Sequence, residues 1–128
     1  MKINFVHSIA LIVFCASMAK AQTALYNNGR MAIHDQGQVG IHTDFINNGI
    51  MDNTAGLVGF YGTNPLRVSG VFSPSLFDFE VMINGGLVLQ TSVNVANNAN
   101  FVLGDVLTPR NQSGVYLHFE NGAFYNGE

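Results

Sequence analysis

The chain has 128 residues, of which 48% are hydrophobic and only 10% charged, and its formal net charge is −3. This length suits one domain, and so many apolar residues exclude a disordered chain. Five Lys and Arg residues stand against eight Asp and Glu residues. We therefore expect no binding to nucleic acid and no attraction to anionic lipid.

The first predicted element is an export signal over residues 1–21. Lys2 supplies a positive start, residues 9–16 are apolar, and the segment ends in Ala19-Lys20-Ala21, an A-x-A cleavage pattern. The apolar run is shorter than the ~20 residues that span a bilayer. We expect a signal helix that is cleaved between Ala21 and Gln22, a mature chain without a membrane span, and a secreted or outer cell-surface location.

Cleavage would change the chemistry of the chain. Both lysines and the single cysteine, Cys15, would leave with the signal. The mature residues 22–128 would keep three arginines against eight carboxylates, a formal charge of −5. Disulfides, thiol catalysis and cysteine-based zinc sites are thereby excluded.

Two similar blocks come after the signal. The pattern N-N-G-x-M begins at Asn27 and again at Asn47, and G-x-V-G-[IF] begins at Gly37 and again at Gly56. A repeat near twenty residues is typical of one coil of a β-solenoid. Asn and Gly tolerate left-handed backbone, so they predict the corners between short strands.

The second half predicts further strands of about 3–6 residues. Apolar residues alternate over 79–83, 87–89, 93–95 and 101–103, with corners at 84–86, 97–100 and 104–105 and an end at Pro109. Pro65 and Pro74 bracket a looser connection, which we expect to interrupt the regular coils. No helical periodicity is present after Ala21.

Two β architectures compete for these strands. The N-G pairs would suit antiparallel hairpins, whereas the twenty-residue repeat favours a parallel β-helix, a β-solenoid of roughly five coils ~4.8 Å apart. In the second, corner asparagines would hydrogen-bond from coil to coil. We predict an all-β domain over 22–128, a parallel β-helix, truncated at its C-terminus because no cap follows Tyr125.

Several segments resemble a recurrent β-solenoid pattern of exported Bacteroidetes cell-surface proteins, which include gliding-motility-associated proteins and type IX secretion cargo. The resemblance rests on residues 45–49, 56–62, 77–84, 86–89, 93–95 and 101–108. It implies a surface-exposed structural or adhesive region, without catalytic residues to carry over. Such cargo normally ends in a C-terminal sorting domain, and this sequence contains none.

Four residues are weak candidates for chemistry. His42 and Asp44 would share a face if they lay in one strand, and could bind metal or act as a base. Asp78 and Glu80 are a similar pair, and paired carboxylates can cleave glycosides. We favour solvated charges, because no third ligand is spaced near the first pair and apolar residues flank the second. We assign no catalytic, cofactor or metal residue.

The expected function is therefore a non-enzymatic structural or adhesive segment of a secreted or cell-surface protein. Surface polysaccharide or other cell-surface proteins are the expected partners. The alternative is a β-helical carbohydrate-active enzyme or a carbohydrate-binding module.

Overall fold

A computed structural model describes residues 24–52 and 54–127, and these contain strands and no helix. The predicted signal, with its cleavage site at Ala21 and Gln22, lies outside the described residues. The strands are β1 (Ala24–Asn27), β2 (Arg30–Ala32), β3 (Gln38–Ile41), β4 (Asp44–Asn47), β5 (Ile50–Asp52), β6 (Leu57–Gly62), β7 (Leu66–Ser69), β8 (Ser75–Ile83), β9 (Leu87–Leu89), β10 (Val93–Leu103), β11 (Val106–Leu107), β12 (Leu117–Phe119) and β13 (Phe124–Gly127).

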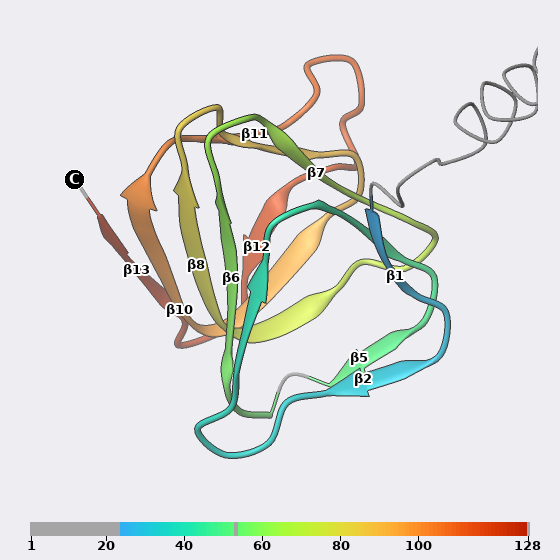
Figure 1. Cartoon of the computed structure of the whole chain (residues 1–128), viewed down its shortest axis with the longest axis vertical. Coiled ribbons are helices and arrows are strands. Elements are labelled where there is room, and N and C mark those ends of the chain that lie inside the picture. The colour runs from blue at the N-terminus through green and yellow to red at the C-terminus, as the bar shows by residue number, and fades with distance from the viewer. Residues whose placement is uncertain (1–23, 53, 128) are drawn as a thin grey trace, which may run out of the picture.

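The described strands pair in parallel and stack into a β-solenoid (Figure 1). One sheet has the order β1-β4-β7-β9-β11, and a second has the order β3-β6-β8-β10-β12, with β13 also paired to β10. A short third sheet joins β2 to β5. Each strand of the first sheet opens a new turn, so the solenoid has about five turns. The prediction of an all-β parallel solenoid is confirmed, and the antiparallel hairpins are wrong.

The sequence repeat corresponds to the strand pairing of the first two turns, because equivalent repeat positions are register partners. Leu25 lies beside Phe45, Met31 beside Met51, and Gly40 beside Gly59. These are the positions that the N-N-G and G-x-V-G patterns align. The repeat exists because stacked positions of successive turns have the same environment.

The cross-section of the solenoid changes after the second turn. The first two turns each have three strands, whereas the later turns lack the third sheet and contain the longer strands β8 and β10, of nine and eleven residues. The expected limit of about six residues per strand is therefore wrong. The expected interruption between Pro65 and Pro74 is also wrong, because β7 lies there and pairs with both β4 and β9.

The expected corner at residues 97–100 is wrong as well, since these residues lie inside β10. The pairing of β10 with β8 shifts between Val95 and Asn98, where two residues of β10 lie opposite Phe77 alone. Such a bulge bends a strand without ending it. Asparagine is used here for cross-strand hydrogen bonds and not for a corner.

The interior is a stack of apolar side chains, and an aromatic column runs from it to the exposed Tyr125. Phe45, Phe60, Phe79, Phe101 and Tyr125 succeed one another, and neighbouring ring centroids lie 6.0–6.4 Å apart. The first three are fully buried. Tilted and edge-on ring pairs at these separations add to the stabilisation from buried area.

The corner asparagines form the predicted ladder. The Asn27 side-chain amide donates to Oδ1 of Asn47 over 2.8 Å, and the Asn47 amide donates to the carbonyl of Phe72 in the next turn over 3.0 Å. Outside this buried pair, Asn48 donates to Asn28 over 3.3 Å. The third turn has no asparagine here, so its backbone takes over the acceptor role.

Candidate functional site

His42 and Asp44 do not form the expected pair. β3 ends at Ile41 and β4 begins at Asp44, so a corner separates the two residues. The His42 ring lies against Tyr61, with centroids 5.6 Å apart. Asp44 accepts the backbone N–H of Arg67 over 2.9 Å and lies 3.5 Å from its guanidinium. The condition for a shared strand face is therefore not met, because the chain turns between the two side chains.

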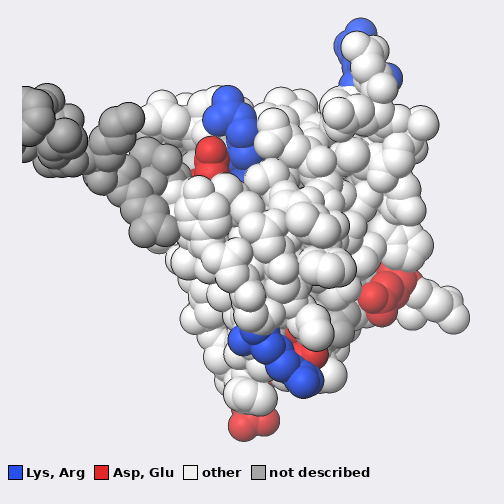
Figure 2. Space-filling view, turned by 90° about the vertical axis from the view of Figure 1, so that its right-hand side faces the viewer, with Lys and Arg blue, Asp and Glu red and all other residues white. Residues whose placement is uncertain are grey.

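Charged groups are few among the described residues, and four of them form ion pairs. Figure 2 shows a largely uncharged face on which basic and acidic side chains touch at two places. The two ion pairs among the described residues are Arg67–Asp44 and Arg30–Asp52, the second with a 2.6 Å contact and an Arg30 side chain that is 70% exposed. Both link successive turns, and exposed pairs of this kind contribute about 0–1 kcal/mol.

Asp78 and Glu80 do share a face, as predicted, but both are held by the next turn. The Asn97 amide donates to Oδ1 of Asp78 over 2.7 Å. The Asn100 amide donates to Oε2 of Glu80 over 2.7 Å, and the Tyr61 hydroxyl donates to Oε1 over 2.9 Å. Hydrogen bonds to an ionised acceptor are the stronger kind. The Glu80 carboxylate therefore ties three successive turns together.

The Tyr61 ring lies over two glycines of the repeat. A Cβ built on Gly59 would collide with the Tyr61 hydroxyl, and one on Gly40 would lie 3.4 Å from a ring carbon. The second glycine of each G-x-V-G block thus leaves room for this ring. Burial, the hydrogen bond to Glu80 and the Glu80 charge all raise the pKa of Tyr61 above 10.0. Tyr61 therefore remains a protonated donor at neutral pH.

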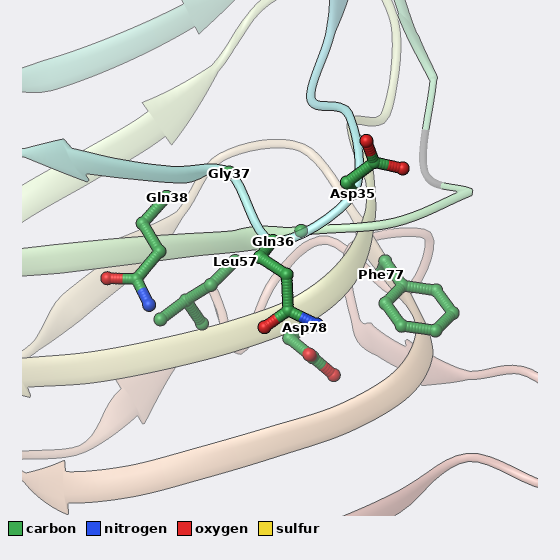
Figure 3. A pocket seen from close by; sticks show the side chains of 8 residues that line it. Asp35, Gln36, Gly37, Gln38, Leu57, Phe77 and Asp78 are labelled. Carbon is green, nitrogen blue, oxygen red and sulfur yellow. The ribbon is translucent and has the colours of Figure 1, made fainter.

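An open hollow of about 180 Å³ lies next to Asp78, near the start of β3, β6 and β8 (Figure 3). Gln38, Leu57 and Asp78 are stacked on its wall as register partners. The residues that line it are Asp35, Gln36, Gly37, Gln38, Gly56, Leu57, Phe77 and Asp78. Of this set, the sequence analysis named Asp78 as a candidate for chemistry and Gly37 and Gly56 as repeat positions.

Two glycines of the repeat line the hollow. Gly37 and Gly56 are the first glycines of the two G-x-V-G blocks, and the N–H of Leu57 bonds to the carbonyl of Gly37 over 2.9 Å. Gly56 has a φ of +82°, and a Cβ there would collide with Ile33. A side chain at this position is therefore excluded by both conformation and space. The glycines of the repeat were the signal that could have located the hollow.

The described ranges contain neither a metal-binding cluster nor a long apolar helix. Among residues 24–52 and 54–127, no three His, Cys, Asp or Glu side chains lie close enough together to hold a metal ion. The same residues include no helix of the length and hydropathy needed to cross a membrane.

Comparison of the chain with protein-family models, with curated proteins and with solved structures finds no match. Its function is therefore inferred from the sequence and from the geometry of the described residues.

Proposed function

We propose that the chain is a non-enzymatic structural or adhesive segment of a secreted or cell-surface protein, in which the solenoid acts as a stiff spacer. One observation carries this proposal. The polar side chains that could have formed an active site, above all Glu80, bond instead to neighbouring turns.

Side-chain bonds between turns occur on several sides of the solenoid. Asn27 bonds to Asn47 at the first corner. On a later turn the Ser92 hydroxyl donates to the carbonyl of Gly114 over 3.0 Å. These bonds add to the parallel ladders, which stack turns ~4.8 Å apart. Five turns linked in this way resist bending and shear, which is what a spacer requires.

The export signal and the resemblance to Bacteroidetes surface proteins support the location. A cysteine-free chain outside the cell needs stability without disulfides. Backbone ladders and a packed apolar interior supply it. The mechanism is mechanical, since the rod holds other parts of a protein away from the surface on which it is anchored.

The alternative of a carbohydrate-active enzyme has a direct test. A general acid or base must reach the proton that it transfers, and both Glu80 oxygens already have partners. We expect no turnover by the mature chain on a panel of neutral and acidic polysaccharides. Cleavage that is lost in both Asp78→Asn and Glu80→Gln, with folding intact, would establish the enzyme instead.

Surface location can be tested in the source cell. The segment around Arg110 is exposed, so an epitope inserted there leaves the strands unchanged. We expect antibody to label intact cells. Label that appears only after permeabilisation, with a cytoplasmic protein as control, would overturn the surface location.

Stiffness can be tested with trypsin, because the mature chain has three arginines and no lysine. Arg30 and Arg67 lie in strands and in ion pairs, whereas Arg110 lies outside the strands. We expect the native chain to be cut at Arg110 alone. Equally fast cleavage at Arg67 would show that the third turn opens readily and would contradict a stiff spacer.

A further inference from the structure

We propose that the hollow at the start of β3, β6 and β8 binds one neutral sugar unit of a polysaccharide. This goes beyond the spacer function and does not rest on it, since a rod without a ligand is still a rod. The inference rests on the shape of the hollow, its mixture of groups and its charge.

Two glycines of the repeat, Gly37 and Gly56, and a break in the side-chain alternation of β8 lie at the hollow. In β8 the buried residues Leu76 and Phe79 are three apart, so the in–out alternation breaks between them and both Phe77 and Asp78 remain half-buried. The break places an aromatic ring and a carboxylate at the same rim.

The groups around the hollow match the two kinds of surface on a pyranose. Leu57 and the Phe77 ring offer apolar surface for the C–H groups of a sugar ring. Gln36 and Gln38 each supply an amide that donates and accepts, and Asp78 supplies an acceptor. In Figure 3 the Gln36 amide extends toward Asp78, and the Asp35 carboxylate points away from both.

The stacked register sets the spacing of these groups. Gln38 and Asp78 lie two strands apart with Leu57 between them. Two strand spacings amount to about 9.6 Å. The wall thus runs polar, apolar, polar, so a ligand over Leu57 reaches an amide on one side and a carboxylate on the other.

The charge of the hollow selects a neutral ligand. No Lys or Arg lines it, so an anionic sugar would meet Asp78 without compensation. Oδ1 of Asp78 already accepts from Asn97 over 2.7 Å, which leaves Oδ2 for a ligand hydroxyl, as no other described group bonds to this side chain. The hollow contains two neutral amides, and its second carboxylate, Asp35, points away from Asp78 (Figure 3), so the groups favour hydroxyls over a cation.

The test is an NMR titration of the mature chain with neutral β-1,4-linked glucose, mannose and xylose oligosaccharides, with an oligogalacturonate as the anionic comparison. We expect at least one neutral sugar to give saturable shifts at the amides of Gln36, Gln38, Leu57 and Asp78. In Gln38→Ala the affinity should fall about tenfold, the equivalent of one hydrogen bond. Gln90→Ala is the matched control, because Gln90 is exposed on the turn after β9.

Three outcomes would overturn the proposal. They are no saturable shift with any neutral sugar, equal affinity in folded Gln38→Ala and in the Gln90→Ala control, and tighter binding of oligogalacturonate. The trypsin and labelling experiments test the spacer function without any sugar. Failure of the sugar-binding proposal is therefore distinguishable from failure of the spacer proposal.

Discussion

The buried corner asparagine, Asn47, offers the sharpest test of what holds the turns together. Its side chain is 0% exposed. It accepts from Asn27 over 2.8 Å and donates to the carbonyl of Phe72 over 3.0 Å. The adjacent Asn48 also makes two bonds between turns, to Asn28 over 3.3 Å and from the N–H of Val71 over 3.2 Å, but it is exposed. The two residues differ mainly in burial.

The expected magnitudes come from this difference. Asn47→Ala removes two hydrogen bonds at about 1 kcal/mol each and leaves Phe72 without its side-chain donor, for a total of about 3 kcal/mol. Asn27 keeps its second bond, to the carbonyl of Ile50 over 3.0 Å, which limits the loss. In Asn48→Ala water can replace the side chain as a hydrogen-bond partner, so we expect a loss of stability of about 0.5 kcal/mol. A domain stability of about 5–15 kcal/mol makes the first change severe.

Urea unfolding of residues 22–128, followed by circular dichroism, measures both variants. With a slope of about 1.5 kcal/mol per M, Asn47→Ala should lower the midpoint by about 2 M and Asn48→Ala by less than about 0.5 M. The slope should stay constant, since the unfolded area is the same. Equal midpoint shifts in the two variants would refute the argument that the hydrogen bonds of the buried Asn47 stabilise the fold more than those of the exposed Asn48.

Three further predictions concern the glycine corner, the aromatic column and the outer tyrosine. Gly49→Ala should cost about 2 kcal/mol, because its Cβ would collide with the carbonyl of Gly29; Gly29→Ala meets nothing within 4 Å and should stay within about 0.5 kcal/mol in the same urea assay. Phe79→Ala empties the middle of the column and should lower the free energy of unfolding by about 4 kcal/mol, measured as a lower melting temperature. A decrease below about 1 kcal/mol would contradict the packing described. The raised pKa of Tyr61 means that the folded chain holds this proton more tightly than the unfolded chain, so the stabilisation is complete below pH 10.0 and is lost as pH rises through the folded pKa. Between neutral pH and a pH above 10.0, the urea midpoint should therefore fall less in Tyr61→Phe than in wild type, and equal falls in the two proteins would contradict the raised pKa.

The sequence predicted the early turns well because they are regular. Asn27 and Asn47 occupy equivalent corners, so the sequence distance between the two motifs equals the sequence distance between paired residues of successive turns. The same logic failed at residues 97–100, because asparagine serves both as a corner residue and as a cross-strand donor. The carboxylates of Asp78 and Glu80 in the preceding turn distinguish these roles, and their proximity to Asn97 and Asn100 is a property of the fold.

The candidate site was less predictable than the fold. Asp78 and Glu80 were recognised as one face because alternation is local. His42 and Asp44 were mispaired because one corner between them reverses the expected geometry. The hollow is lined by Gly37, Gly56 and the residues Phe77 and Asp78 at the break in the alternation of β8, and no single motif connects these three segments.

The sequence separation between paired residues of successive turns varies little, and this has a consequence for how the chain folds. Paired residues are separated by 19 positions at Gln38 and Leu57 and by 26 at Asn98 and Phe124. The loop to be closed for each new turn is therefore short and nearly the same everywhere, and its entropic cost hardly grows along the chain. Each turn finds its template in the turn just completed. Such a chain can fold progressively from its N-terminus as it is synthesised, without waiting for its C-terminal residues.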